Sequence, residues 1–223
     1  MPEVVVGSDL HADPTACIGY RPSRGESGDL TLGPGAHIRS GSALYLGSHI
    51  GARLQTGHNV VIREGCVIGD DVSIWSNTVI DYGCHIGDGV KIHSNCYIAQ
   101  YTEIEDGAFL APGVTIANDL YPGQPVSARL MAGPNIGAGA QIGVNVTILP
   151  YVHIGERALI GAGAVVVLDI PADSVAFGNP AEVRGRVGDL TAIDDRVKAA
   201  ASSMRRRHTS RAPAMSGREG DAS

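Results

Sequence analysis

Large aliphatic residues recur at every sixth position along most of this chain. The recurrence runs without a slip through Ile62, Ile68, Ile74, Ile80, Ile86, Ile92, Ile98, Ile104, Leu110 and Ile116. Neither the helix period of about 3.6 residues nor the plain strand period of about 2 would space single aliphatics in this way. A fixed six-residue period is typical of a stacked β-helix, in which each repeat sends one large side chain inward.

The polar positions of the repeat predict its corners. The third residue after each aliphatic is usually Gly, Asn or Asp, and these types adopt a left-handed backbone at low cost. They are Gly35, Gly41, Gly47, Asn59, Gly65, Asp71, Asn77, Gly83, Gly89, Asn95, Gly107 and Gly113. We therefore expect each hexad to be a short strand followed by a sharp corner. Three hexads then close one triangular coil of 18 residues, and coils stack about 4.8 Å apart.

Breaks in the period predict how the chain is divided. The β-helix domain covers residues 32–187, and residues 1–31 form a partial first coil followed by a loop. The period fails after Ile116 and resumes at Ile136, so residues 118–135 form a loop that leaves the prism. A long loop inside a strict solenoid is usually functional or disordered. Residues 188–223 are expected to be a tail, with one helical stretch and then a disordered end.

Composition narrows the class of protein. The chain has 30 Gly and only 4% aromatic residues, which suits a narrow, all-β solenoid interior. A net charge of −6 does not suggest a nucleic-acid surface. No apolar run approaches the roughly 20 residues of a membrane helix, and the first residues lack the layout of a signal peptide. We therefore expect a cytoplasmic protein with no nucleic-acid or membrane partner.

The cysteines are predicted to be structural. Cys66, Cys84 and Cys96 each lie four residues after a repeat-opening Ile, in a slot otherwise filled by small residues. This position predicts buried core thiols. A cytosolic disulfide between them is not expected, and no Cys/His spacing typical of a zinc site is present. The sequence therefore predicts no metal site.

Several segments together resemble a known family. They are the repeated Ile-Gly-x-x units, the interrupting loop, Ile160-Gly161-Ala162-Gly163-Ala164-Val165-Val166 and Gly178-Asn179-Pro180-Ala181. These segments resemble the left-handed β-helix hexapeptide-repeat acyltransferases. Residues 115–122 (TIANDLYP) further resemble the loop entrance of amino-sugar N-acetyltransferases that act on nucleotide-linked sugars. The resemblance implies a left-handed coil, a homotrimer with active sites between neighbouring prisms, and acetyl-CoA as co-substrate, with no metal required.

Three residues are expected to meet at one corner of the prism. Tyr82, Gln100 and Asn118 follow one another at intervals of one full coil, so they stack on successive coils where the loop departs. The resemblance implies that Asn118 accepts a hydrogen bond from a sugar amine and aligns it for attack. An Asn carbonyl is too weak a base to do more than orient the amine. The alternative is that Asn118 merely caps the loop.

Further catalytic candidates flank this corner. Asp119 could receive a proton or bind a sugar hydroxyl, although Asp after Asn is also ordinary turn chemistry. Tyr121, in the same motif, is a candidate substrate contact. His85, paired across coils with Glu103, or His93, stacked on Trp75, could act as a general base. Either histidine could equally be a contact between subunits with no part in the chemistry.

The C-terminal coils are expected to bind the acyl donor. Small residues would keep one prism face flat for an extended pantetheine arm, namely Gly143, Gly155, Ala162 and Gly163. The resemblance implies that Asn179 and Pro180 border the adenine end of CoA. Arg184 and Arg186 could meet its phosphates, or they could be solvated arginines at a domain end.

The resulting hypothesis is acetyl transfer to the amino group of an amino sugar, in particular a nucleotide-linked one, by direct attack in a ternary complex. A thioester is already activated, so no covalent enzyme intermediate is needed. The alternative is O-acetyl transfer to a sugar or another small hydroxyl compound. The loop residues 118–135 contain no His, which argues against a hydroxyl acceptor because a hydroxyl needs a base more than an amine does. A metal-dependent carbonic anhydrase and a non-catalytic β-helix module are the less favoured alternatives.

Overall fold

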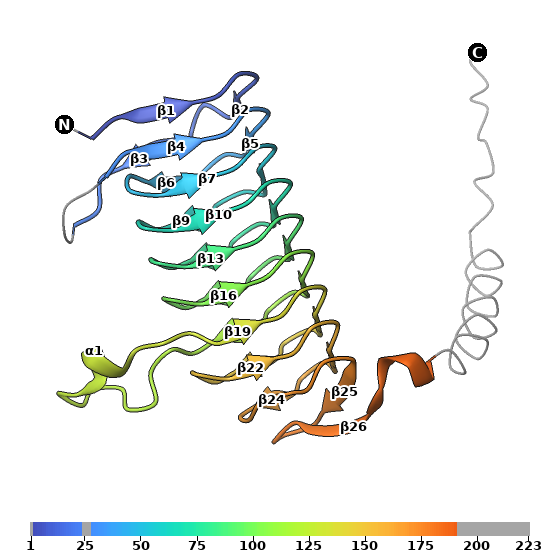
Figure 1. The fold of residues 1–223 in the computed structure, drawn as a ribbon. Helices are drawn as coiled ribbons and strands as arrows, with labels where there is room; N and C mark the ends of the chain where they lie inside the picture. Colours follow the sequence, from blue (N-terminus) through green and yellow to red (C-terminus); the bar gives the residue numbers. More distant parts are fainter. Residues whose placement is uncertain (1, 24–27, 191–223) are drawn as a thin grey trace, which may run out of the picture. The chain divides into compact units, whose positions relative to one another are not determined.

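The computed structural model describes residues 2–23 and 28–190, and its main compact unit is residues 1–187. From residue 4 to residue 166 the chain winds through three sheets of short strands, which follow one another in strict rotation (Figure 1). Strands of successive coils pair in parallel, and register partners lie one coil apart, as in Val67 with His85 and Val79 with Tyr97. The predicted all-β parallel β-helix, with three hexads in each coil, is therefore confirmed.

The three sheets are named here A, B and C. Sheet A contains β1 (Val4–Val6), β4 (Leu30–Leu32), β7 (His49–Ile50), β10 (Val67–Ile68), β13 (His85–Ile86), β16 (Glu103–Ile104), β19 (Asn135–Ile136) and β22 (His153–Ile154). Sheet B contains β2 (His11–Ala12), β5 (His37–Ile38), β8 (Gln55–Thr56), β11 (Ser73–Ile74), β14 (Lys91–Ile92), β17 (Phe109–Leu110), β20 (Gln141–Ile142), β23 (Leu159–Ile160), β25 (Ser174–Phe177) and β26 (Glu182–Arg186). Sheet C contains β3 (Cys17–Tyr20), β6 (Ala43–Tyr45), β9 (Val61–Ile62), β12 (Val79–Ile80), β15 (Tyr97–Ile98), β18 (Thr115–Ile116), β21 (Thr147–Ile148) and β24 (Val165–Val166).

The core is a set of columns of inward side chains. The aliphatic residues of the six-residue repeat are buried, and most of them are fully so. Burying one such side chain stabilises the fold by about 1.5–3 kcal/mol, so the columns supply most of the driving force for stacking. Cys66, Cys84 and Cys96 lie in the same interior as free thiols, which confirms their predicted burial in the core.

The corners have the backbone that the sequence predicts. All twelve predicted Gly, Asn and Asp corner residues have a positive φ. The same slot holds Arg53 and Tyr101, which also have φ near 60°. A left-handed residue closes the turn in each case.

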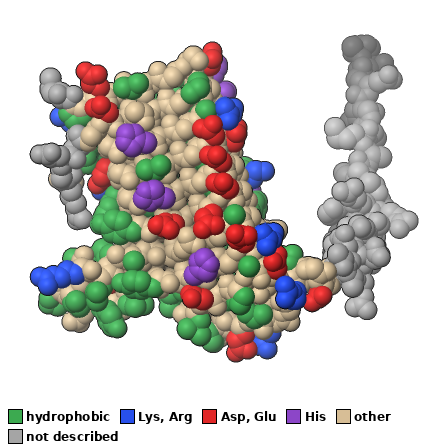
Figure 2. Space-filling model, viewed as in Figure 1, with side chains coloured by type: hydrophobic (Ala, Val, Ile, Leu, Met, Phe, Trp, Pro, Cys, Tyr) green, Lys and Arg blue, Asp and Glu red, His purple; other side chains and the backbone are tan. Residues whose placement is uncertain are grey.

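The predicted loop leaves the prism between β18 and β19 and carries the only α-helix of the described residues, α1 (Ser127–Leu130) (Figure 1). Glu103 before the loop pairs with Asn135 after it, so the coils continue in register across the loop. Apolar side chains of the loop are exposed, and Figure 2 shows hydrophobic atoms gathered around it. They include Leu120, Tyr121, Val126 and Leu130, each 40% exposed or more.

The two ends of the prism differ from a plain repeat. Strands β1, β2 and β3 each pair with the next coil, so the first coil contributes to all three sheets. At the other end β25 and β26 form an antiparallel hairpin on sheet B, followed by a short 3-10 helix, η1 (Val187–Leu190). From residue 191 onward, the predicted helical stretch and the predicted disordered end lie outside the described residues. No helix in the described part of the chain is long and apolar enough to cross a membrane.

Candidate functional site

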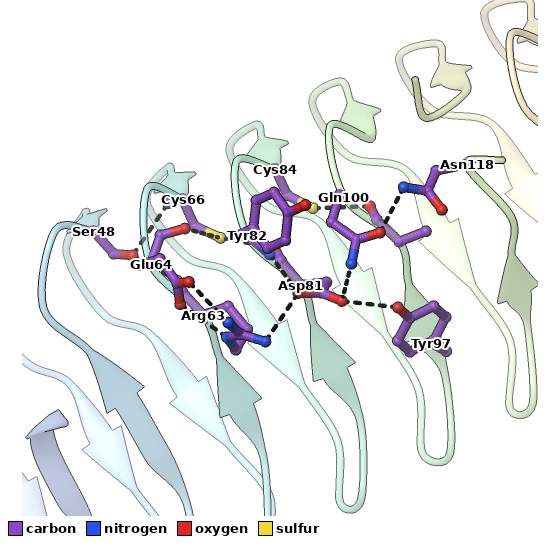
Figure 3. A network of polar contacts seen from close by, with 11 residues as sticks. Ser48, Arg63, Glu64, Cys66, Asp81, Tyr82, Cys84, Tyr97, Gln100 and Asn118 are labelled. Carbon is purple, nitrogen blue, oxygen red and sulfur yellow. Dashed lines mark hydrogen bonds and ion pairs between the residues drawn. The ribbon is translucent and has the colours of Figure 1, made fainter. Parts of the chain in front are cut away.

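A polar network lies at the corner where sheet C turns towards sheet A and where the loop begins (Figure 3). Asn118 Nδ2 donates a hydrogen bond to Gln100 Oε1 at 2.5 Å. Gln100 Nε2 in turn donates to Asp81 Oδ2 at 2.5 Å. These three residues follow the inward side chains of β18, β15 and β12, so the stacking of the coils brings them together.

Asp81 is the buried anchor of this network. The residue is only 6% exposed, and its carboxylate also accepts hydrogen bonds from Tyr97 Oη and from the backbone N–H of Tyr82, both at 2.8 Å. Arg63 Nη1 lies 3.5 Å from its other oxygen. A buried carboxylate is costly unless it is hydrogen-bonded and paired, and these four donors meet that requirement.

This arrangement fixes the orientation of the Asn118 amide. An ionised carboxylate can only accept hydrogen bonds, so Gln100 must turn its NH₂ group towards Asp81. The Gln100 carbonyl oxygen then faces Asn118, which must donate a hydrogen bond from its own NH₂ group. Asn118 Oδ1 consequently points away from the network, as Figure 3 shows, and it has no protein partner within the described residues.

Arg63 closes the other end of the network. Its guanidinium makes two hydrogen bonds of 2.8 Å to Glu64 and lies over the rings of Tyr45 and Tyr82, 5.2 and 5.8 Å from their centroids. The hydrogen bonds to Glu64 are the main reason why the pKa of Arg63 is raised. Tyr97, at the opposite side of Asp81, has its pKa raised to about 12 by burial first and by its bond to Asp81 second.

Hydrogen bonds to Asn118 and Asp119 hold the base of the loop. The backbone N–H of Ala132 donates to the Asn118 carbonyl oxygen at 3.0 Å, which joins the two ends of the loop. Asp119 accepts one hydrogen bond from the backbone N–H of Tyr121 at 2.8 Å and a second from the Ser127 hydroxyl. The Asp119 carboxylate therefore shapes the loop, while Tyr121 itself is 52% exposed.

The two candidate histidines lie on other surfaces. His93 is half-buried on the sheet B side, where it stacks on Trp75 at 4.3 Å and contacts Phe109 at 4.9 Å. His85 is exposed on sheet A and is the register partner of Glu103. No hydrogen bond joins His85 to Glu103 in the described structure, and Glu103 accepts one from Asn135 at 3.2 Å.

His85 contributes to a shallow depression on sheet A, whose face carries histidine and acidic side chains (Figure 2). Glu103, Asp106 and Asn135 line the same depression of about 460 Å³. Among the described residues, no three His, Cys, Asp or Glu side chains are grouped as metal ligands.

Three members of the network, Asp81, Arg63 and Tyr97, were not identified from the sequence. Asp81 and Arg63 each directly follow an inward Ile, at a slot where side chains are outward and usually solvated. A usable signal was present, because opposite charges spaced by one coil stack on neighbouring coils. Tyr97 gave no signal of its own, since only the three-dimensional arrangement brings its hydroxyl to Asp81.

Comparison with known proteins places this arrangement in a family. A model of the bacterial transferase hexapeptide family, with six repeats, matches residues 47–81, 83–118 and 133–167. The matched segments are coils of the prism, and most of the loop falls between them. The chain belongs to the hexapeptide-repeat family.

Members of the hexapeptide-repeat family with named activities match parts of the chain. Galactoside O-acetyltransferase of Lactococcus lactis subsp. lactis is 38% identical over 82 residues, which cover 35% of this chain and 40% of that protein. Serine acetyltransferase 4 of Arabidopsis thaliana is 46% identical over 56 residues, which cover 25% of this chain and 16% of that protein. The chain spans less than half the length of these curated relatives.

One solved hexapeptide-repeat structure matches nearly the whole chain. It is the UDP-N-acetylglucosamine O-acyltransferase of Moraxella catarrhalis RH4, with a TM-score of 0.54 and 19% identity, over 92% of this chain and 82% of that one. At this identity the likeness concerns the fold alone. The fold is a left-handed parallel β-helix, as the family resemblance implies.

The candidate donor residues lie on the last coils of the prism. Gly143 and Gly155 allow close contact between coils, since an added Cβ would meet backbone atoms of Ala162 and Ala172. Ala162 and Gly163 are exposed, and space around Gly163 is open. Asn179, Pro180 and Arg184 are exposed in and beside the β25–β26 hairpin, where Arg184 pairs with Glu182 at 2.8 Å.

Proposed function

We propose that this chain is an acetyl-CoA-dependent N-acetyltransferase acting on the amino group of an amino sugar that is linked to a nucleotide. The observation that carries the proposal is the orientation of Asn118. Its Oδ1 atom is an acceptor held outward at the base of the loop, which suits an N–H donor on the incoming acceptor.

The proposed reaction is direct attack within a ternary complex. The neutral amine nitrogen attacks the thioester carbonyl carbon, the C–N bond forms and the C–S bond breaks. One amine proton ends on the released CoA thiol, and the proton lost from the ammonium form goes to solvent. Asn118 contributes by holding the amine lone pair towards the thioester, which is catalysis by orientation rather than by proton transfer.

The donor would lie along the last coils. In this proposal the pantetheine arm runs past Gly163 and Ala162, where no large side chain obstructs it, and Asn179 and Pro180 border the adenine end. Arg184 would have to exchange its exposed pair with Glu182 for a CoA phosphate. Exposed pairs of this kind contribute only about 0–1 kcal/mol, so the exchange costs little.

A homotrimer completes the proposed site. The exposed apolar side chains of the loop, Leu120, Tyr121, Val126 and Leu130, suit a surface that packs against a neighbouring prism. Residues of that neighbour would then face the Asn118 corner and contribute to acceptor binding.

O-acetyl transfer is the second candidate function. The similarity to a galactoside O-acetyltransferase favours it, and exposed His85 on sheet A is a candidate base for a hydroxyl. O-acetyl transfer requires a hydroxyl acceptor and His85 as a base, whereas N-acetyl transfer requires an amine acceptor and Asn118 to orient it.

Both candidates are tested by thiol release from acetyl-CoA in the presence of two matched acceptor panels. One panel holds amino sugars and their nucleotide-linked forms, and the other holds the corresponding hydroxyl sugars. We expect release with amines alone. Release only with hydroxyl sugars would overturn N-acetylation in favour of O-acetylation, and release with neither panel would overturn both.

A further inference from the structure

A column of stacked side chains on the sheet B side of the prism lacks one member. Arg39, Gly57, Trp75 and His93 directly follow the inward residues of β5, β8, β11 and β14, so they lie one above another on successive coils. The rings of Trp75 and His93 are parallel to within 9°, with centroids 4.3 Å apart. At the coil on the other side of Trp75 the column has Gly57, which has no side chain to cover the second face of the indole.

A hollow of about 350 Å³ lies beside Gly57 and Trp75. Its lining includes Arg39, Gln55, Gly57, His58, Ser73 and Trp75. Two coil steps separate Arg39 from Trp75, or about 9.6 Å at the usual strand spacing of about 4.8 Å. A flat ring placed at the level of Gly57 would then lie about 4.8 Å from the Trp75 ring, within the range of about 4.5–7 Å found for stacked rings, and Arg39 would lie one coil further on.

The polar groups around the hollow favour an anion. Arg39 is exposed and has no ion-pair partner in the part of the chain that the structure describes. Its guanidinium can stack on a planar ring or make two hydrogen bonds to a phosphate. His58 beside it is held through Nδ1 by the Ser40 hydroxyl at 2.7 Å, which leaves its second ring nitrogen available.

We propose that this hollow binds a nucleotide, with the base stacked on the open face of Trp75 at the level of Gly57 and the phosphate on Arg39. The site lies at a different corner from Asn118, since Trp75 follows a sheet B strand and Asn118 follows a sheet C strand. The nucleotide of a sugar carrier, a free nucleotide and the nucleotide end of CoA share this chemistry. Binding at the hollow does not depend on the proposed acetyl transfer.

The chain carries its own reporter for this binding, because Trp75 is its single tryptophan. The fluorescence of the full chain is titrated with UMP, AMP, GMP and CoA, and with uridine and ribose 5-phosphate as ligands that lack the phosphate or the base. We expect saturable quenching by at least one nucleotide or by CoA, and the ligand that quenches identifies the source. Ribose 5-phosphate should not quench, because it has no ring to stack.

Variants separate the two contacts in calorimetric titrations with the same nucleotide. Trp75→Leu should weaken binding by about tenfold or more, in line with the loss of one base–aromatic stack. Arg39→Gln should weaken binding of the nucleotide but not of its nucleoside, whereas Arg53→Gln, which removes a cation paired with Asp71 outside the hollow, should leave both unchanged. The proposal is overturned by an absence of quenching, or by unchanged affinity in a folded Trp75→Leu or Arg39→Gln variant.

Discussion

The orientation of the Asn118 amide is set by a carboxylate that it never touches. An asparagine at the edge of a loop can present either its oxygen or its NH₂ group, because the two ends of the amide are nearly equal in shape. Asp81 removes that freedom through Gln100, since each amide in turn must donate towards the carboxylate. In the proposed mechanism Asp81 is thus a positioning residue, which acts on the acceptor only through its two neighbours in the network.

Asp81→Asn should release this constraint. An amide at position 81 can either donate or accept, so Gln100 and Asn118 can both invert and turn an NH₂ group towards the amine. We expect kcat for acetyl transfer to fall by about tenfold or more with little change in the KM for acetyl-CoA. Steady-state thiol release measures both constants.

Tyr97→Phe is the matched control for this change, because it removes one donor to Asp81 but leaves the carboxylate and its bond to Gln100. It should keep most of the turnover. A fully active Asp81→Asn variant with an unchanged melting temperature would remove Asp81 from the mechanism.

Tyr97 also makes a prediction about pH. Burial and the bond to Asp81 raise its pKa to about 12, above the ordinary value of about 10. The folded state therefore holds the phenolic proton more tightly than the unfolded state. The resulting stability is fully present below pH of about 10 and is lost as the pH rises towards about 12.

Ultraviolet titration of phenolate absorbance in the folded protein checks this prediction. The difference between wild type and Tyr97→Phe should contain one phenol that ionises near pH 12. In parallel, the urea midpoint of wild type should fall more steeply over this range than that of the variant. A difference curve centred near pH 10 would contradict the predicted shift.

At the scale of single residues, the sequence predicted which side chains stack at this corner but not that Asp81 is buried there. Spacing by one coil placed Gln100 beside Asn118 because a strict register leaves no other arrangement. The burial of Asp81 depends on Tyr97, whose ring leaves an outward strand position and reaches across the corner. A contact of that kind follows from side-chain length and rotamer, which a repeat period does not specify.

The loop is the element on which the proposed site depends. Its two ends lie together through the hydrogen bond between Ala132 and Asn118, and its first turn is held by Asp119. The sequence located the loop because the period fails there. It left the role of Asp119 open between turn chemistry and proton transfer, and the hydrogen bonds to Tyr121 and Ser127 account for its place in the turn.

Asp119→Asn and Ser127→Ala should each loosen the loop through the same lost contact. We expect faster proteolytic cleavage at Arg129, which is exposed in α1, and a higher KM for the acceptor with a smaller effect on kcat. The double variant should be no worse than the worse single variant, because both changes break one hydrogen bond. Additive losses would indicate that Asp119 has a second, catalytic role.

On the scale of the whole molecule, stability comes from nearest-neighbour contacts between coils. Gly69 illustrates how closely the coils approach, since an added Cβ would overlap the Asp88 carboxylate and lie 2.9 Å from its backbone nitrogen. Gly69→Ala should therefore lower the free energy of unfolding by about 1–3 kcal/mol. Urea unfolding measures the loss.

Gly185→Ala is the control, because no atom lies within 4 Å of a Cβ added there. Its effect should stay within about 0.5 kcal/mol. Equal losses in the two variants would show that glycine itself, rather than contact between coils, sets the cost.

The whole fold was more predictable than the site because one period determines it. Nearly every hexad repeats an inward aliphatic residue and a corner. A single exception, such as the non-aliphatic Thr56, therefore does not change the predicted positions of the strands in the other coils. The ends depart from the period, and there the sequence was less informative. The first coil contributes to all three sheets, and the exit forms the β25–β26 hairpin, which the six-residue period does not specify.

The most direct test of the account is the turnover of Asn118→Ala with an amine that the wild-type chain acetylates. The substitution removes the outward Oδ1 acceptor and the bond to Gln100 but leaves the buried columns intact. We expect the rate of thiol release to fall by about a hundredfold at saturating acetyl-CoA, with the melting temperature within a few degrees of wild type. A wild-type rate in the folded variant would contradict the central claim that Asn118 orients the acceptor amine.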